Sequence, residues 1–406
     1  MLKRPPRETL TPRMIQKVVG AGTRDSSFAT AAASVRELAE CTLSAKQVRR
    51  LTLQAGRERV AERRQQVTEF TGRTLMERTS AKPGVQPPEV GVLMLDNGLH
   101  QRRDHFGEPD RQTHWKQETG GLVLSMTSAV HAEDPCPDMP AWLFEGQVVR
   151  EIANLAGRRE SRDNAGEPAE ADEPAELLAA SEPGGFEWTP RLLARDVIAS
   201  TAGAGIARHL ECVAWERGIT AAPRQAFVGD GASVIWNIHQ RYFSQMTPIL
   251  DLMHALSYAW RAAMGLQTPG VYRRWAQAIW QGRVRDVLAE LREHQTRLGP
   301  PCQTPASDDP RECVARAITY YEHHQSRMAY PAYRRQGLPI TSSLMESAIK
   351  QLNQRVKGTE KYWTHQNVEA MLQLRADALS DSQPLPTFWT RRQTQITGSN
   401  RYHSAS

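Results

Sequence analysis

Four short apolar runs constrain the fold of this chain more than any other feature of its 406 residues. Each run is far shorter than the roughly 18–20 residues that cross a bilayer, and each suits a buried strand. Taken with the helical patterns between them, they give the order strand, strand, helix, strand, helix, strand, helix. That order predicts a mixed α/β sheet with helices on its faces. The predicted strands are VGVLMLD at 90–96, GLVLSMTSAV at 121–130, QAFVGD at 225–230 and TPILDLMH at 247–254.

The chain is expected to divide into consecutive segments of different composition. Three prolines and one glycine in AKPGVQPPE indicate a linker, and helical patterns lie on both sides of the sheet. The expected segments are a helical region over 1–80, a linker over 81–89, a sheet domain over 90–254, an all-helical insertion over 255–337, a segment over 338–380 with the last long helix, and a C-terminal tail over 381–406.

Two stretches inside the sheet domain have distinct patterns. Residues 157–188 are rich in Glu, Ala, Pro and Gly, and within them residues 158–187 carry 3 Arg against 9 Asp and Glu, a net charge of −6. So few large apolar residues cannot form a core, and we expect a solvent-exposed, disordered insertion. Residues 190–217 show a helical pattern that ends at Gly218, which predicts a helix.

The first 80 residues carry most of the positive charge. They contain 16 Lys and Arg against 8 Asp and Glu, whereas the whole chain has a net charge of +6. A basic segment of this kind indicates a polyanionic partner such as nucleic acid. Two predicted helices, 27–39 and 45–55, resemble a helix-turn-helix. The second would present Lys46, Arg49 and Arg50 to a DNA groove. A small helical bundle with a basic surface is the alternative.

The cysteines and the N-terminal residues bear on the compartment. Five cysteines are present and none forms a Cys-x-x-Cys pair, which argues against a disulfide framework and against a cysteine-ligated zinc site. The first residues, MLKRPPRETLTPRM, are basic but lack the apolar stretch of a secretory signal. We therefore expect a cytoplasmic protein without membrane association. The nucleotide-binding patterns GxGxxG after a strand and GxxxxGK[ST] do not occur.

Three acidic residues lie where a metal site would place them. Asp96 ends the first predicted strand, Asp230 ends the third, and Glu346 lies in the first turns of the last long helix. Alone, each is typical of a turn or cap. Together they meet the need of phosphodiester cleavage by two Mg²⁺ or Mn²⁺ ions, which takes carboxylates converging from different elements. Asp251 and His254, at the end of the fourth predicted strand, are accessory candidates, although such a histidine is also typical of a helix cap or core.

The sequence blocks around these positions resemble the motif blocks of a known family. MLDNG, VGDGASVIWNI, ILDLMHA and LPITSSLMESAIKQLNQRVKGTEKYW are similar to those of bacterial insertion-sequence transposases of the DDE type. The nearest group is the ISKra group, related more distantly to Mutator-like transposases. The resemblance implies an RNase H-like fold. It also implies that Asp96, Asp230 and Glu346 form the catalytic, metal-binding triad, with Asp251 and His254 as an accessory motif.

The resemblance, which covers about residues 90–380, also implies an activity. A DDE transposase uses two metal ions to cleave DNA at the transposon ends and then joins the freed 3′-OH to target DNA, without a covalent protein–DNA intermediate. Its partners would be double-stranded DNA, as terminal inverted repeats and as target, and further copies of the chain on that DNA in the nucleoid. Asn97, Thr341 and Leu344 depart from the residues usual in these motifs but remove no carboxylate.

Basic and aromatic residues near Glu346 fit a site that processes DNA. On one helix, Lys350 lies at i+4 and Lys357 at i+11 from Glu346, which places them roughly on one face. Such a cationic track would bind phosphates next to the scissile one. Trp363 is a candidate to stack on an unpaired base near the transposon end, with a buried core indole as the alternative.

Three other functions remain open from the sequence. One is an RNase H-like nuclease without strand transfer, and a second is a catalytically inactive, transposase-derived protein that binds DNA site-specifically. The third, a serine or tyrosine recombinase, would need a nucleophilic hydroxyl beside basic residues. The residues that could form such a group are Tyr320, Tyr321, His323, His324 and Arg327.

Overall fold

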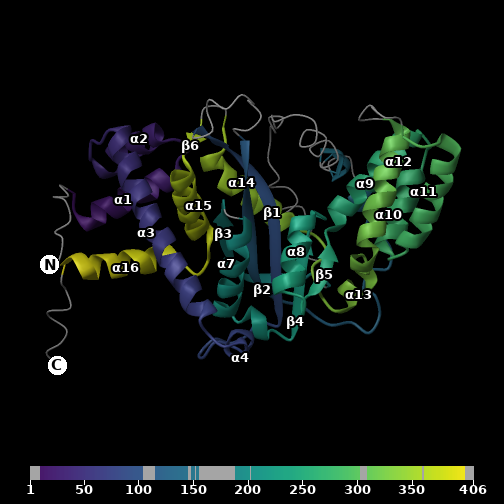
Figure 1. Cartoon of the computed structure of the whole chain (residues 1–406), viewed down its shortest axis with the longest axis horizontal. Coiled ribbons are helices and arrows are strands. Elements are labelled where there is room, and N and C mark those ends of the chain that lie inside the picture. The colour runs from purple at the N-terminus through teal and green to yellow at the C-terminus, as the bar shows by residue number, and fades with distance from the viewer. Residues whose placement is uncertain are drawn as a thin grey trace.

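The chain forms three adjoining parts along its longest axis (Figure 1). The N-terminal helices stand at one end, a mixed sheet lies in the middle, and the helices of the predicted insertion stand at the other end. The computed structural model describes residues 10–103, 115–144, 148–150, 152–154, 188–201, 203–301, 309–358 and 361–397.

Among the described residues, six strands form one sheet. Five of them lie side by side in the order β3-β2-β1-β4-β5, and β6 pairs with the far end of β1. β1, β2 and β3 are antiparallel neighbours, whereas β1, β4 and β5 run parallel. The prediction of a mixed α/β sheet with flanking helices is confirmed. The strands are β1 (Val90–Arg102), β2 (Trp115–Thr127), β3 (Arg191–Ser200), β4 (Arg224–Gly229), β5 (Thr247–Leu250) and β6 (Tyr362–Trp363).

The first strand is longer than the sequence predicts. β1 pairs with β4 only as far as Leu95, opposite Gly229, but its pairing with β2 continues to Gln101. The prediction that this strand ends in a turn at Asp96 is therefore wrong. The Asp-Asn-Gly sequence stays extended because β2 supplies backbone partners on one side after β4 has ended on the other.

The segment predicted as one helix over 190–217 is a strand followed by a helix. β3 pairs with β2, with Val197 opposite Leu122, and α7 (Gly203–Glu216) comes after it. The run RLLARDVIAS contains good helix formers, but the free edge of β2 offers a full set of backbone partners. This tertiary pairing overrides the local propensity.

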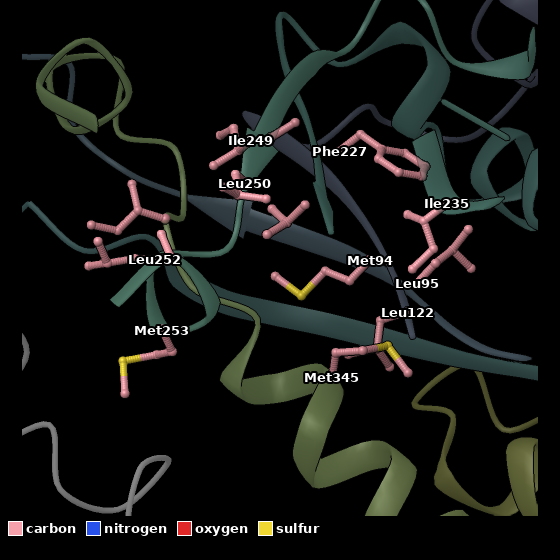
Figure 2. Packing of buried hydrophobic residues seen from close by; sticks show 14 of the residues in the cluster. Met94, Leu95, Leu122, Phe227, Ile235, Ile249, Leu250, Leu252, Met253 and Met345 are labelled. Carbon is pink, nitrogen blue, oxygen red and sulfur yellow. The ribbon is translucent and has the colours of Figure 1, made fainter. Parts of the chain in front are cut away.

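Helix α14 (Ser343–Val356) packs directly on the sheet. A Cβ added to Gly120 of β2 would stand 2.5 Å from the Ile349 side chain and 3.1 Å from that of Met345. Figure 2 shows Met345 among the core side chains contributed by β1 and β2. Glycine at position 120 therefore permits the close approach of α14 to the central strands.

The insertion predicted over 255–337 is helical, as expected. Two of its helices return to the sheet, because the hydroxyl groups of Tyr320 and Tyr330 donate to backbone carbonyls at the ends of β4 and β5. The insertion is therefore packed against the strand ends. Its helices are α9 (Leu252–Leu266), α10 (Val271–Trp280), α11 (Val284–Leu298), α12 (Pro310–His324) and α13 (Tyr330–Arg335).

The acidic insertion predicted over 157–188 lies outside the described residues, except for Trp188. That side chain is buried, and its ring lies edge-on to Trp280 of α10 with 6.0 Å between the ring centroids. Trp188 therefore belongs to the core, and the predicted end of the insertion is wrong at this residue.

The N-terminal region forms helices, as predicted. α1 (Pro12–Arg24) and α2 (Phe28–Ala39) precede α3 (Ala45–Thr71). Ser44 and Gln47 form a capping box at the start of α3, in which each side chain accepts a hydrogen bond from the other residue's backbone N–H. The helix continues well beyond the predicted end at residue 55.

The long helix α3 packs along α15 (His365–Leu379) through paired charges. Arg59 Nε donates to Asp377 at 2.8 Å and Arg63 donates to Glu369 at 2.7 Å, and all four side chains are buried. A buried charge without its partner would be costly, so each pair requires both helices to be docked. The N-terminal helices are therefore docked on α15 and do not pack as a separate unit.

The tail predicted over 381–406 contains a further helix, α16 (Pro384–Thr397). Its Phe388 and Trp389 are buried in the same cluster as the apolar side chains of α1. The linker 81–89 has neither helix nor strand. Among the described helices, none combines the length and the apolar character that crossing a bilayer requires. The remaining elements are α4 (Leu75–Thr79), α8 (Ser233–Tyr242) and the 3₁₀ turns Ala141–Phe144, Ile219–Ala221 and Gln325–Arg327.

The contact between α3 and α15 depends on Gly56. A Cβ added there would stand 2.5 Å from the Ala370 carbonyl oxygen, so Gly56→Ala should lower the thermal midpoint although alanine favours helices. Overpacking of this kind costs about 1–3 kcal/mol of unfolding free energy. The control is Gly20→Ala in α1, where the Cβ would meet the flexible end of Arg24. Calorimetry should show a lower midpoint for the first variant alone; equal midpoints would contradict the close packing.

Candidate active site

Three acidic residues lie side by side across the neighbouring strands β1, β4 and β5. In the register of the parallel strands, Leu95 pairs with Gly229, which pairs with Leu250. Neighbouring strands lie about 4.8 Å apart, so the residues that directly follow Leu95, Gly229 and Leu250 have adjacent backbones. Asp230 and Asp251 directly follow β4 and β5, whereas Asp96 lies within β1. The residues that follow the last pairs are Asp96, Asp230 and Asp251.

Asp96 faces the helix that carries Glu346. It lies directly opposite Gly120 of β2, and paired residues of an antiparallel ladder point to the same face of the sheet. That face is covered by α14, whose Ile349 approaches Gly120. One carboxylate oxygen of Asp96 accepts from the backbone N–H of Asn97 at 2.6 Å. β1 and α14 therefore bring two residues of the predicted triad to one side of the sheet.

Asp251 is a fully buried carboxylate that connects three elements. It follows β5 and caps α9, because Oδ2 accepts from the backbone N–H and from Nδ1 of His254, at 2.8 and 2.6 Å. Oδ1 accepts from the backbone N–H of Ser342, at 2.7 Å, just before α14. Burial alone would raise the pKa of Asp251, but the hydrogen bonds from His254 and Ser342 hold that pKa below its ordinary value. The carboxylate therefore stays charged and keeps the start of α14 beside β5.

Glu346 is a carboxyl group whose pKa is raised mainly by burial. Loss of hydration raises the pKa of its carboxyl to about 7. The positive charge of His254 opposes this rise in pKa, as does that of Lys350, one turn further along α14. The negative charges of Asp251 and Asp96 reinforce it. Glu346 is therefore close to both aspartates and carries a proton for part of the time at neutral pH.

Asp230 is held at a tight turn. Its side chain is buried, and one carboxylate oxygen accepts from the backbone N–H of Ala232 at 2.9 Å. Its own carbonyl oxygen accepts from the Tyr320 hydroxyl at 3.0 Å. Gly231 has a φ of 101°, a conformation that residues with a Cβ rarely adopt. The turn thus fixes both the backbone and the carboxylate of Asp230.

The described residues hold no ready-made metal cluster, since no three His, Cys, Asp or Glu side chains among them lie close enough to bind one ion. The donor types nevertheless suit Mg²⁺ or Mn²⁺, which take carboxylate oxygens. A cation would also offset the burial of Glu346 and the negative charges of Asp251 and Asp96, which together raise the pKa of its carboxyl. In their chemistry the residues fit a divalent cation, and Asp96, Asp230 and Glu346 are those that would hold it.

The predicted DNA-binding cations occupy two regions. Lys46, Arg49 and Arg50 are exposed on α3, as expected. Lys350 is partly exposed on α14 and close enough to the acids to lower the pKa of Glu346. Lys357 follows α14 in an extended conformation, so the continuous helical track predicted from position 346 to 357 ends one residue early.

Trp363 is a core residue, and the prediction that it stacks on a DNA base is wrong. It is 6% exposed, and its indole N–H donates to the carbonyl oxygen of Val356 at 2.8 Å. Its ring lies edge-on to Phe28 of α2, and the Arg355 guanidinium lies over it. The pairing of β6 with the end of β1 explains the burial, because it places this residue under the N-terminal helices.

The tyrosines considered as nucleophiles are buried. Tyr320 is 7% exposed and donates to the carbonyl oxygen of Asp230. Tyr321 is fully buried, donates to the carbonyl oxygen of Ala255 at 2.8 Å, and has a pKa raised well above its ordinary value by loss of hydration. Neither hydroxyl can reach a DNA backbone in this structure, which removes the support for a tyrosine recombinase.

Comparison with known proteins gives no assignment for this site. No family model matches the chain, and no curated protein matches its sequence. A function must therefore be inferred from the motif blocks and from the arrangement of side chains described above.

A buried polar pair next to the site was not singled out from the sequence. His100 Nδ1 and Glu118 Oε2 lie 3.0 Å apart, and both side chains are buried. Position 100 shares the face of Asp96, because residues of a strand alternate between the two faces. No local sequence pattern indicates this pair, because it depends on the continued pairing of β1 with β2 beyond Asp96.

Glu346→Gln should change how stability depends on pH. The pKa of Glu346 in the folded chain, about 7, exceeds the ordinary 4.5, so the unfolded chain releases this proton first as the pH rises. The native protein therefore loses stability between about pH 4.5 and 7 and bears the full cost above pH 7. In metal-free buffer the Gln variant should melt above the wild type at about pH 8, and at nearly the same temperature at about pH 4.

The matched control is Glu293→Gln on the exposed surface of α11. Its thermal midpoint should follow that of the wild type at both pH values. A Glu346→Gln variant that melts below the wild type at about pH 8 would contradict the raised pKa of Glu346.

Proposed function

We propose that this chain is a DDE transposase of the bacterial insertion-sequence type, similar to the ISKra group, with an RNase H-like core. The observation that supports this most is that acids from three distant segments lie in the same region of the sheet. Asp96 and Asp230 come directly after Leu95 and Gly229, which pair between β1 and β4. Glu346 lies on α14, the helix that faces Asp96. The sheet order, with three antiparallel strands followed by two parallel ones, is compatible with an RNase H-like core.

Each residue of the site has a role in this proposal. Asp96, Asp230 and Glu346 would hold two Mg²⁺ or Mn²⁺ ions, which supply activation of water and stabilisation of the leaving oxygen at the scissile phosphodiester. Glu346 must release its proton before its carboxylate can serve as a ligand. Asp251 keeps the start of α14 at the strand ends, so that Glu346 stays close to Asp96. Lys350, one turn along α14, would attract a phosphate oxygen of the DNA.

The same site would serve both steps of transposition. Hydrolysis at the transposon end frees a 3′-OH, and that hydroxyl then displaces a phosphodiester oxygen in target DNA. No side chain needs to attack the DNA, which agrees with the burial of Tyr320 and Tyr321. The proposed partners are double-stranded DNA and further copies of the chain on that DNA, in the cytoplasmic nucleoid.

The proposed DNA-binding surface is the start of α3, with Lys46, Arg49 and Arg50. Cationic side chains on an exposed helix bind phosphates and bring the protein to DNA. The buried ion pairs of Arg59 and Arg63 join the same helix to α15. DNA held on α3 would therefore stand at a fixed distance from the acids.

A second candidate is a catalytically inactive, transposase-derived protein that binds DNA site-specifically. The observation that favours it is the distance between the acidic side chains. Among the described residues, no three His, Cys, Asp or Glu side chains lie close enough together to hold a metal ion. The two candidates, and an RNase H-like nuclease without strand transfer, differ in cleavage and joining of end DNA.

Asp230→Asn should separate catalysis from binding. The change is nearly isosteric but removes a charge that a hard divalent cation needs, so Mg²⁺-dependent cleavage and strand transfer should both be lost. Affinity for terminal-repeat DNA should persist, because phosphate contacts come from Lys and Arg elsewhere. The test is a gel-shift affinity and a cleavage rate, in Mg²⁺ or Mn²⁺, on one preparation.

The matched control is Asp286→Asn, which changes an exposed aspartate of α11 and should leave both quantities unchanged. Cleavage retained by Asp230→Asn would refute its role as a ligand. A wild-type protein that binds terminal repeats tightly but cleaves them under no metal condition would favour the inactive DNA-binding protein.

Replacing Lys46, Arg49 and Arg50 with Ala should weaken binding of terminal-repeat DNA. Each phosphate contact that is lost should also reduce the slope of log affinity against log salt by about one. The control replaces three exposed arginines of the helical insertion with Ala and so removes the same number of positive charges away from α3. Unchanged affinity and slope across the salt series would exclude α3 from the interface. The control positions are Arg274, Arg283 and Arg292.

A further inference from the structure

The turn that carries Asp230 is held from outside the sheet. The hydroxyl of Tyr320, from α12 of the insertion, donates to the Asp230 carbonyl oxygen at 3.0 Å. The Tyr320 ring also fills the space beside Gly231, where an added Cβ would stand 2.7 Å from ring atom Cε2. One side chain therefore contacts both residues that set the direction of the Asp230 carboxylate.

Tyr320 is itself held in place by the insertion. Its ring stacks on that of Tyr258 of α9, with 3.7 Å between the centroids and 15° between the planes. It also contacts the ring of His324, with centroids 4.7 Å apart. A ring packed in this way has little freedom to move, so its hydroxyl offers a fixed donor to the turn.

The same pattern recurs at the next strand. The hydroxyl of Tyr330 donates to the carbonyl oxygen of Leu250 at 3.0 Å, directly before Asp251. The hydroxyl of Tyr333 donates to the carbonyl oxygen of Pro248 at 3.2 Å. Three tyrosines of the insertion thus donate to backbone carbonyls, one directly after β4 and two within β5.

We infer that Tyr320 is a positioning residue that holds the Asp230 turn in the geometry the site needs. Its catalytic consequence rests on the proposed function, whereas its effect on the turn does not. The carbonyl bond and the ring contact at Gly231 restrain the backbone, and the restrained backbone keeps the Asp230 carboxylate at the sheet edge. The helical insertion is therefore part of the site.

The test compares Tyr320→Phe with Tyr321→Phe. Both changes remove one buried hydroxyl from α12, but the Tyr321 hydroxyl donates to the Ala255 carbonyl oxygen in α9, away from the turn. The first readout is amide hydrogen exchange of the full chain over residues 227–236, which reports on the turn without any activity. The second is the Mg²⁺ concentration that gives half-maximal cleavage of terminal-repeat DNA.

Tyr320→Phe should speed exchange at the Ala232 amide by about five- to tenfold, the effect of one lost hydrogen bond. It should raise the half-maximal Mg²⁺ concentration by a similar factor and leave the affinity for DNA unchanged. Tyr321→Phe should change neither exchange at the turn nor the Mg²⁺ dependence, although it should also lower the thermal midpoint.

Equal exchange at the turn in Tyr320→Phe and wild type would overturn the inference. So would equal effects of the two variants, because a general loss of packing would then explain both. If wild-type protein cleaves no DNA at any Mg²⁺ concentration, the proposed function fails. The exchange measurement still decides in that case whether Tyr320 holds the turn.

Discussion

The arrangement of the candidate site depends most on one buried carboxylate, that of Asp251. Its two oxygens accept from the backbone and ring of His254 and from the backbone N–H of Ser342. These bonds join the end of β5, the start of α9 and the start of α14. Together with the packing of Ile349 against Gly120 and the hydrogen bond from the Leu252 N–H to the Ile340 carbonyl oxygen, they hold the start of α14 near the strand ends. A carboxylate with these hydrogen bonds saturated acts as a structural anchor, which is a different role from that of Asp96 and Asp230.

Much of the site could be predicted from sequence because its strands are short and clearly bounded. An apolar run followed by Asp and Gly, as at Asp230, indicates a strand and its end. The start of α14 was also predicted, since Ser342 and Ser343 precede a helical pattern. Local sequence patterns could not predict which strands pair with one another. β1 continues past Asp96, and residues 191–200 form a strand, because β2 offers both of them backbone partners.

The other differences come from contacts between residues far apart in the chain. Arg63 and Glu369 are both typical surface residues in sequence, yet together they bury an ion pair that docks α3 on α15. Trp363 lies beside a basic helix in sequence, and only its pairing with the end of β1 shows it to be a core residue. The sequence alone makes Tyr320 a candidate nucleophile. In the structure its hydroxyl donates to the Asp230 carbonyl oxygen, which is the basis of the positioning role inferred above. Such outcomes are set by tertiary packing and not by local pattern.

The central claim is that Asp96, Asp230 and Glu346 come together around divalent cations when DNA is bound. The most direct measurement is diffraction from crystals of the chain with terminal-repeat DNA and Mn²⁺, using the anomalous signal of the metal. The account predicts two anomalous peaks between these three carboxylates, next to a DNA phosphate. Anomalous signal at another group, such as His100 and Glu118, or DNA bound with no metal near Asp230, would contradict it.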